Sequence, residues 1–331
     1  MKNFIIGLLF LCGFYACSSG KENISEVDCA QYVNPFIGNA DNGHTFPGAC
    51  APFGMIQASP ESGNASWRYC SGFNYEDDEI FGFAQNHLNG TGCPDLGDIL
   101  MLPFSGIIEN REYKARIDKS RQTARPGYYA VTLPDFGINA EVTATEHTAF
   151  YRYTYQNDEE ANLFIDLQSG LVTSPQGIRD RVLFSDMQMP DGRTITGHNE
   201  TNGWVRRHFY YVIAFDKSYK VKEMLPVREG EKAKRFVLSF DLKRGEALQV
   251  KIALSVSVNG AKASLQKENP DWNFDKMKGE TYQRWNTLLQ RVRVEGTDKQ
   301  KTNFYTSLYH LYIQPNNIAD TDGRYRGVND S

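Results

Sequence analysis

The stretch that decides the fold runs Leu248-Gln249-Val250-Lys251-Ile252-Ala253-Leu254-Ser255-Val256-Ser257-Val258. Its large apolar side chains alternate with polar or small ones at every second residue, and this period of two predicts a β-strand with one buried and one solvated face. The pattern recurs upstream in Tyr128 to Leu133, Ile138 to Thr145, Phe150 to Tyr155, Asn162 to Leu167, Val205 to Phe215 and Phe236 to Leu242. Turn signals such as Pro190-Asp191-Gly192 separate these segments without intervening helices, so the sequence predicts a mainly β fold, a large antiparallel β-sandwich.

The pattern changes to a helical one after residue 270. One helical stripe is predicted by the spacing of Phe274, Met277, Trp285, Leu288 and Val292. A second helix, capped by Asp298 and ending before Pro315, carries Phe304, Leu308, Leu311 and Tyr312. Two such helices without partners would expose their apolar stripes, so we expect them to pack on further helices and the chain to be the front part of a longer protein.

Composition narrows the class of function. The 331 residues carry a net charge of −4 with a pI of about 5.9, so the chain has no basic footprint for nucleic acid. Aromatic residues reach 13%, with 18 Tyr and 20 Phe. That content is typical of a β-rich protein that faces carbohydrate.

The N-terminus predicts export. Residues 1–17 read as a signal peptide, with Lys2 before an apolar run that is too short to span a membrane. The run ends Ala16-Cys17-Ser18-Ser19-Gly20, which looks like a bacterial lipoprotein box with Cys17 as the lipid anchor and residues 18–28 as a tether. A plain secretory signal cut near Ala16 is the alternative. Either way we expect a periplasmic or outer-membrane protein, held to the membrane only through a lipid.

Four cysteines remain in the mature chain, Cys29, Cys50, Cys70 and Cys93. They allow three full disulfide pairings, and the sequence does not choose among them. Their spacing is too long for a zinc ribbon, so no metal ligand set is predicted. Because Cys70 and Cys93 flank the polar motifs, free thiols buried near a site are a further alternative.

Residues 29–105 are rich in Gly, Pro, Asn and aromatics, with short apolar strands such as Ile99 to Leu102. The densest part is Asn86-His87-Leu88-Asn89-Gly90-Thr91-Gly92-Cys93-Pro94-Asp95-Leu96-Gly97-Asp98. Planar donors and acceptors on closely approaching, glycine-rich backbone are typical of sugar sites. The alternative is a glycine-rich surface turn.

Further candidates precede this loop. His44 lies in Asn42-Gly43-His44-Thr45-Phe46-Pro47-Gly48-Ala49 and is either a ligand donor or a structural histidine. Trp67-Arg68-Tyr69-Cys70 sets an indole, which suits the C–H face of a sugar, beside a guanidinium; a core Trp with a surface Arg is the alternative. The acidic run 76–79 is more typical of a solvated face than of a catalytic pair. Asp320-Thr321-Asp322-Gly323 is a weak calcium-loop signal without its twelfth-position Glu.

Motifs in a fixed order resemble those of glycoside hydrolase family 92. They are Asn34-Pro35-Phe36-Ile37-Gly38, Gly43-His44-Thr45-Phe46-Pro47-Gly48-Ala49, Pro52-Phe53-Gly54-Met55, His87-Leu88-Asn89-Gly90-Thr91-Gly92 with Gly97-Asp98-Ile99, Asn316-Asn317-Ile318-Ala319-Asp320, and Gly323-Arg324-Tyr325-Arg326-Gly327. Together they cover residues 29–331.

The resemblance implies a calcium-dependent, inverting exo-α-mannosidase, commonly α-1,2, acting on mannose-containing N-glycans or mannooligosaccharides. It implies an N-terminal β-sandwich at 29–262, a linker helix at 263–296 and, at 297–331, the start of an incomplete (α/α)6 catalytic barrel. In the family the barrel supplies the general acid, the general base and most calcium ligands, so we assign no catalytic and no metal-binding residue to this chain.

The sandwich would then supply sugar contacts. The residues carried over as substrate-binding are His44, Trp67, Arg68, Cys70, His87, Asn89, Asp95 and Asp98. Asp95 and Asp98 either accept from hydroxyls or brace the loop. The alternative function is a non-catalytic carbohydrate-binding surface lipoprotein, which would have measurable mannoside affinity where a fragment of the enzyme would have weak affinity or none.

Overall fold

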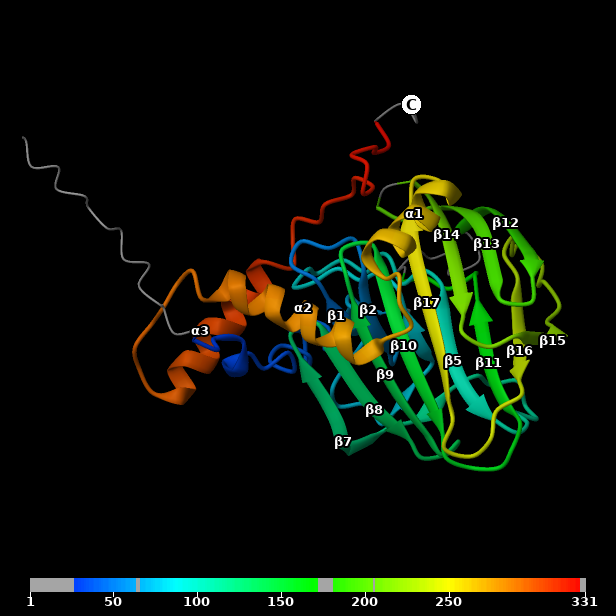
Figure 1. Cartoon of the computed structure of the whole chain (residues 1–331), viewed down its shortest axis with the longest axis horizontal. Helices are drawn as coiled ribbons and strands as arrows, with labels where there is room; N and C mark the ends of the chain where they lie inside the picture. Colours follow the sequence, from blue (N-terminus) through cyan, green and yellow to red (C-terminus); the bar gives the residue numbers. More distant parts are fainter. Residues whose placement is uncertain (1–26, 64–65, 172–180, 205, 328–331) are drawn as a thin grey trace, which may run out of the picture.

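The computed structural model describes residues 27–63, 66–171, 181–204 and 206–327. The predicted signal peptide, the lipid-anchor residue Cys17 and most of the tether at 18–28 lie outside these residues. Figure 1 shows two layers of strands, with helices against the outer side of one layer.

Two large antiparallel sheets form the sandwich. The seven-stranded sheet has the order β1 (Ala49–Cys50), β2 (Gln57–Glu61), β4 (Gly82–Ala84), β5 (Leu100–Ser105), β11 (Ala161–Asp166), β16 (Arg235–Phe240) and β15 (Tyr219–Met224). The eight-stranded sheet has the order β12 (Val182–Asp191), β13 (Thr194–Thr201), β14 (Arg207–Phe215), β17 (Ala247–Ser255), β10 (Thr148–Tyr155), β9 (Ile138–Ala144), β8 (Tyr128–Leu133) and β7 (Asp118–Arg125). A small pair, β3 (Glu79–Ile80) and β6 (Ala115–Arg116), lies outside both.

The core fills the space between the sheets, as the alternating pattern predicts. Phe83 from one sheet contacts Tyr129, Tyr151 and Tyr153 from the other, with ring centroids 6.2–6.3 Å apart. These side chains belong to one continuous cluster of buried apolar residues. The predicted β-sandwich fold class, with helices following it, is therefore confirmed.

Four of the strands with six or more residues were not predicted by alternation because their sequences are too polar. Strands β7, β12 and β15 lie at sheet edges, where charged and exposed side chains hinder pairing with another chain. The fourth, β13, is internal but carries Thr, His, Asn and Glu. These segments are strands because of their positions in the sheets, and a local sequence pattern does not show those positions.

The last strand ends earlier than its alternating pattern predicts. Pairing stops at Ser255, and α1 (Val258–Glu268) begins three residues later. The Ser257 hydroxyl accepts the Gly260 N–H at 3.0 Å, which satisfies one of the free donors of the first helical turn. The prediction of a strand through Val258 is wrong over its last three residues because this N-cap ends the extended conformation.

The outer face of β17 is also not solvated as predicted. Lys251 is only 4% exposed, and Ala253 and Ser255 are buried as well. Helix α1 packs over β14 and β17, and α2 (Phe274–Leu289) lies across β9 and β10 (Figure 1). The Lys251 ammonium donates to the Asn269 carbonyl at 2.7 Å, and burial lowers its pKa to about 8.

Helices α2 and α3 (Asp298–Leu311) pack on each other and on the N-terminal turn η1 (Ala30–Tyr32). Trp285 of α2 is fully buried, donates its indole N–H to the Cys50 carbonyl at 2.7 Å, and contacts the Tyr309 ring at 4.4 Å. The predicted unpartnered stripes therefore have partners inside this chain, although Leu311 is 66% exposed. The predicted cap also differs, because Thr297 caps α3 and Asp298 is its first residue.

The prediction of a single linker helix over 263–296 is not met. Residues Asn269 to Asn273 separate α1 from α2. Asn273 caps α2 by accepting the Lys276 N–H at 3.0 Å. None of the helices in the described part of the chain has the length and hydropathy needed to cross a membrane.

A buried ion pair holds the C-terminal segment on the sandwich. His147 donates from Nδ1 to Glu268 and from Nε2 to the Ala319 carbonyl at 2.7 Å. Next to it, Asp320 accepts from the Ser255 hydroxyl at 2.7 Å. Burial lowers the pKa of His147, but the Glu268 carboxylate outweighs it, so the His147 pKa is raised; the His147 partner lowers the pKa of Glu268 against burial.

This pair makes stability depend on pH. Because folding raises the pKa of His147, the stabilisation from its charged form is complete below the ordinary pKa of 6.5. This stabilisation is lost as pH rises through the pKa of the folded state. Because folding lowers the pKa of Glu268, the stabilisation from its charged form is complete above the ordinary pKa of 4.5. This stabilisation is lost as pH falls through the pKa of the folded state. Both contributions are complete between pH 4.5 and pH 6.5. Glu268→Gln should therefore lower the free energy of unfolding by about 1–3 kcal/mol in that pH range and by less at alkaline pH, as measured by urea unfolding. An equal cost at alkaline pH would contradict the assignment.

Candidate functional site

The glycine-rich segment 86–98 forms a tight loop that leads into β5. An isolated antiparallel bridge between His87 and Leu96 closes it. Leu96, Gly97 and Ile99 all have φ between 56° and 77°, in the left-handed region that costs non-glycine residues energy. The surrounding contacts must over-determine such a backbone, and they come from the rest of the sandwich.

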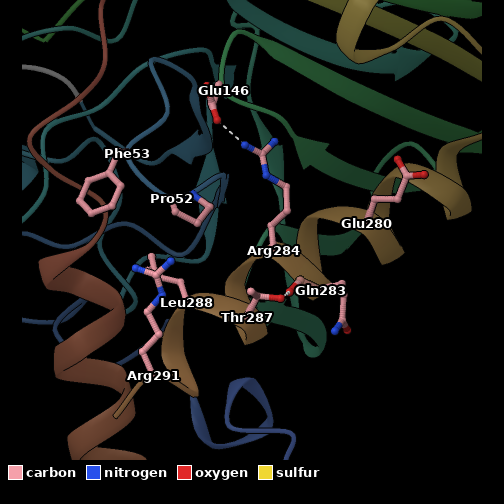
Figure 2. A pocket seen from close by; sticks show the side chains of 9 residues that line it. All are labelled: Pro52, Phe53, Glu146, Glu280, Gln283, Arg284, Thr287, Leu288 and Arg291. Atoms are coloured by element: carbon pink, nitrogen blue, oxygen red, sulfur yellow. Dashed lines mark hydrogen bonds and ion pairs between the residues drawn. The ribbon is translucent and has the colours of Figure 1, made fainter. Parts of the chain in front are cut away.

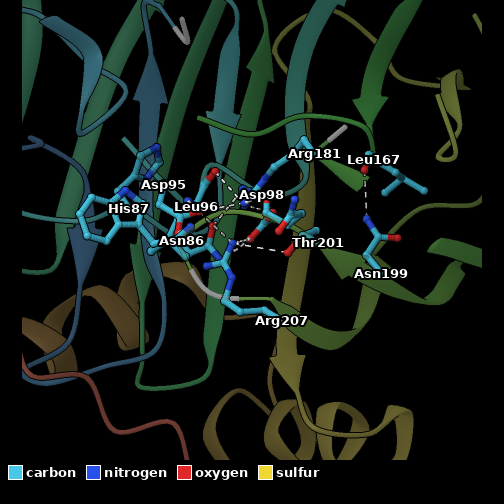
Figure 3. A network of polar contacts seen from close by, with 12 residues as sticks. Asn86, His87, Asp95, Leu96, Asp98, Leu167, Arg181, Asn199, Thr201 and Arg207 are labelled. Carbon is cyan, nitrogen blue, oxygen red and sulfur yellow. Dashed lines mark hydrogen bonds and ion pairs between the residues drawn. The ribbon is translucent and has the colours of Figure 1, made fainter. Parts of the chain in front are cut away.

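Arg181 is the main support of this loop (Figure 3). The guanidinium is fully buried and donates to Asp95 at 2.8 Å and to Asp98 at 2.7 Å. It also donates to the Leu96 carbonyl at 3.1 Å. One planar fork therefore fixes both carboxylates and the backbone between them.

A second guanidinium balances the charge. Arg207 approaches both Asp95 and Asp98 at 3.4 Å. Asn86 donates to Asp98 at 2.9 Å and accepts the Asp98 N–H at 2.9 Å. Burial raises the Asp98 pKa, but the two arginines and Asn86 outweigh it and hold that pKa below its usual range. Of the two predicted roles for Asp95 and Asp98, these contacts favour bracing.

His87 belongs to the same support layer. Its ring is fully buried, with Nδ1 2.8 Å from the Gln57 carbonyl and Nε2 3.3 Å from the Glu61 carboxyl group. Burial raises the pKa of Glu61 despite His87. A β-carbon on Gly72 would lie 2.9 Å from the His87 ring, so the pocket around this pair requires glycine. His87 holds the base of the loop rather than its surface.

Trp67, His44 and Gly90 meet at the outer side of the loop. The His44 ring lies edge-on to the Trp67 indole, with centroids 4.8 Å apart. The His44 carbonyl accepts the Gly90 N–H at 2.6 Å and the Ser71 hydroxyl. A β-carbon on Gly92 would lie 2.3 Å from the indole, so glycine is needed for Trp67 to pack there. Trp67 remains 55% exposed.

Two polar atoms in this cluster find no hydrogen-bond partner among the described residues. They are His44 Nε2 and Asn89 Oδ1, and both atoms are buried. His44 itself has φ of 54°. Buried polar atoms without partners cost free energy and are rare, so each requires a reason. Both atoms are closed to solvent here, so a ligand hydroxyl reaches them only if the side chains around them move.

The remaining predicted site residues have structural partners. Arg68 donates to Asn74, Glu76 and Asp77 at 3.0–3.1 Å, so the acidic run neutralises its fork. All four cysteines in the described residues are free. Cys70 is buried and its thiol donates to the Trp67 carbonyl at 2.9 Å, and burial raises its pKa to about 11.

No group of three His, Cys, Asp or Glu in the described ranges could hold a metal ion. The weak calcium-loop motif is used otherwise, because Asp320 bonds to Ser255 and Asp322 pairs with Arg324 at 2.7 Å. These residues therefore do not fit a calcium site.

A cleft of about 650 Å³ lies elsewhere, between α2 and the turn at Pro52 (Figure 2). Its polar lining includes Arg284, which pairs with Glu146, and Arg291. None of the predicted substrate-binding residues lines it.

Sequence reasoning missed four residues that build the site: Glu61, Arg181, Trp204 and Arg207. The Trp204 N–H donates to Asp95 at 3.0 Å, yet its side chain is 73% exposed. A local signal existed, since Gly203-Trp204 is followed by Arg206-Arg207 and so resembles the Trp67-Arg68 motif. Glu61 and Arg181 carried no such signal.

Known proteins resemble the chain along nearly its whole length. The model of the glycosyl hydrolase family 92 N-terminal domain matches residues 32–255, and that of the family 92 catalytic domain matches 260–331. An uncharacterized secreted glycosidase of Arthroderma benhamiae is 26% identical over 88% of the chain. A family 92 α-mannosidase of Bacteroides thetaiotaomicron superposes with a TM-score of 0.83 and 32% identity over 92% of it. An inverting mannosidase of that bacterium, 23% identical with a TM-score of 0.75 over 91% of the chain, shares the fold.

The fold and the family-model matches thus define one class of protein, the glycosyl hydrolases in which a β-sandwich precedes a helical region. The chain belongs to glycosyl hydrolase family 92. It spans 42% of the Arthroderma protein and 43% of the Bacteroides α-mannosidase.

Proposed function

We propose that this chain forms the sandwich side of the active site of an exported, calcium-dependent, inverting exo-α-mannosidase specific for α-1,2 linkages, anchored by lipid on Cys17. The observation that carries the proposal is the exposed Trp67 indole, which packs on Gly92 of the glycine-rich loop and edge-on to the His44 ring. Family membership and the α-mannosidase relative support the substrate class, a mannose-containing glycan.

Each predicted residue has a role in this proposal. The C–H face of the terminal sugar stacks on Trp67, and its hydroxyls bond to His44 and Asn89 once the side chains that cover these two residues have moved. The supporting residues His87, Cys70, Asp95 and Asp98 position the loop and the Trp67 turn. Arg68 remains a proposed contact for ligand hydroxyls at the rim, held there by Asn74 and its acidic partners.

Hydrolysis itself needs two carboxyl groups, one to protonate the glycosidic oxygen and one to direct water. The buried carboxylates beside this site already have partners, since Arg181 binds Asp95 and Asp98 and His87 faces Glu61. We therefore assign the acid, the base and the calcium ligands to residues outside this chain. The 331-residue chain alone should bind mannosides weakly and hydrolyse none.

The test is titration of the chain with α-1,2-mannobiose by saturation-transfer NMR, with product analysis in parallel. We expect millimolar binding, no released mannose, and a two- to tenfold weaker affinity in Trp67→Ala, because aromatic stacking contributes about 0.5–1.5 kcal/mol. Ile107→Ala is the control, since Ile107 is 80% exposed beyond the opposite end of β5.

Three outcomes would change the proposal. Turnover of mannobiose would place the catalytic carboxyl groups within this chain. Micromolar affinity without turnover would favour the non-catalytic binding lipoprotein. An unchanged affinity in Trp67→Ala would remove the sugar platform and leave the loop as a structural turn.

A further inference from the structure

We propose that the pair Asn202-Gly203 is a site of spontaneous deamidation, and that the modified residue weakens the anchoring of the 86–98 loop. The inference is independent of the proposed function, since it concerns the chemistry of the backbone that holds this loop. The observation that carries it is the Gly203 N–H, which has no hydrogen-bond partner among the described residues and directly follows an exposed asparagine.

The reaction needs only these two residues and water. The Gly203 backbone nitrogen attacks the side-chain amide carbon of Asn202, and the proton that it loses leaves with the ammonia that is expelled. The product is a cyclic succinimide. Water then adds its hydroxyl group to one of the two ring carbonyl carbons, the ring nitrogen takes up the proton and that C–N bond breaks. One opening gives aspartate, and the other gives isoaspartate, in which the chain runs through the side chain.

The chain has four Asn-Gly pairs, and the hydrogen bonding of the glycine nitrogen distinguishes them. In three pairs the glycine N–H is a donor: Gly43 to the Ala40 carbonyl at 3.1 Å, Gly90 to the His44 carbonyl at 2.6 Å and Gly260 to the Ser257 hydroxyl at 3.0 Å. A nitrogen must give up its proton and its hydrogen bond before it can attack, so these bonds oppose the reaction. Within the part of the chain that the structure describes, the nitrogen of Gly203 alone has no such bond to lose.

Exposure of the asparagine does not make this distinction, because Asn42 and Asn259 are exposed as well as Asn202. The backbone does separate two of these residues. Asn259 lies in α1, whereas Asn202 follows the last residue of β13 and belongs to no helix or strand. A regular helix fixes the backbone dihedral angles, and ring closure has to change them. Asn202 is therefore the pair in which both the nucleophile and the local backbone allow the reaction.

The modification would disturb the loop because residues 202–204 anchor it. The Asn202 carbonyl accepts from Arg181 at 2.9 Å, and the Trp204 N–H donates to Asp95 at 3.0 Å. A β-carbon on Gly203 would lie 2.2 Å from the Asp95 carboxylate, so a displaced chain has no room there. Isoaspartate adds one methylene group to the backbone between the two anchors and turns the Asn202 carbonyl into a carboxylate. At least one of the two hydrogen bonds must then break.

The test follows all four pairs in one sample. The purified chain is held at mildly alkaline pH, folded in buffer and unfolded in guanidinium chloride, and each Asn-Gly peptide is quantified by mass spectrometry over time. Dividing the folded rate by the unfolded rate for each pair removes the effect of the local sequence. We expect this ratio to be several times higher for Asn202 than for the other three asparagines, Asn42, Asn89 and Asn259. A ratio for Asn202 no higher than theirs would overturn the assignment.

A second measurement tests the consequence for the loop. Isoaspartate at position 202 should lower the Tm of the aged chain by about 3–10 °C, because a hydrogen bond to a buried charge is lost. Asn202→Gln closes the ring far more slowly and should keep its Tm over the same time. Freshly prepared Asn202→Asp carries the charge on an exposed side chain without the extra methylene group, so its Tm should match that of the wild type. If Asn202 deamidates and the aged wild type still unfolds at the same temperature as aged Asn202→Gln, the anchor survives and the proposed weakening is wrong.

Discussion

Replacing Arg181 with Met should lower the free energy of unfolding by about 3–5 kcal/mol. The reason is that Arg181 is the closest counter-charge of two buried carboxylates, Asp95 and Asp98, and Arg207 approaches them only at 3.4 Å. Met fills a similar volume, so the loss is one of charge and hydrogen bonds. Urea unfolding followed by circular dichroism measures it.

Two controls isolate the effect of the Arg181 ion pairs. Arg206→Met removes a neighbouring arginine whose side chain is 65% exposed but which pairs with the largely buried Glu200, and it should cost about 1 kcal/mol. Arg181→Lys keeps the charge without the fork and should fall between the two. A loss in Arg181→Met no larger than in Arg206→Met would contradict the role of Arg181 as the support of the loop.

The Arg181 effect should also depend on pH. The Asp98 pKa is lowered in the folded state, so its ion pairs stabilise the fold fully above the ordinary value of 3.8 and are lost as pH falls through the folded pKa. The difference between wild type and Arg181→Met should therefore shrink in acid. A difference that grows in acid would require another source for the stabilisation.

Trp285→Ala should cost about 3–5 kcal/mol, the usual loss for a fully buried large aromatic. Trp285 joins α2 to Tyr309 of α3 and to the Cys50 carbonyl of β1, so its removal leaves a cavity where helices meet sandwich. Amide hydrogen exchange should show faster opening in α2 and α3 than in β10 or β17, because those strands belong to the separate inter-sheet core.

Leu311→Ala is the matched control for Trp285→Ala. Leu311 lies on α3 and is 66% exposed, so truncation there should change stability by less than about 0.5 kcal/mol. Trp285→Phe should lose mainly the hydrogen bond to Cys50, about 1 kcal/mol. Uniform loss of protection across all strands in Trp285→Ala would mean that helices and sandwich unfold together.

The candidate loop was predictable because its chemistry is concentrated in thirteen consecutive residues, 86–98. The residues that hold this loop in place were not predictable in the same way. Arg181 lies 83 residues from Asp98, and Glu61 lies 26 residues from His87. An ion pair between segments far apart in the sequence leaves no local period. By contrast, Trp67 and Gly92 are residue types that stand out in the sequence itself.

The sequence by itself determined the sandwich, the helical region after it, and the family motifs. Side-chain alternation and helical spacing are local consequences of backbone geometry, so both can be recognised in the sequence. The tertiary structure alone decided that β17 is covered on both faces, that Asp95 and Asp98 brace rather than lie free, and that Trp204 stands exposed beside them. These outcomes depend on which distant segments meet, because burial and charge pairing are properties of the packed molecule.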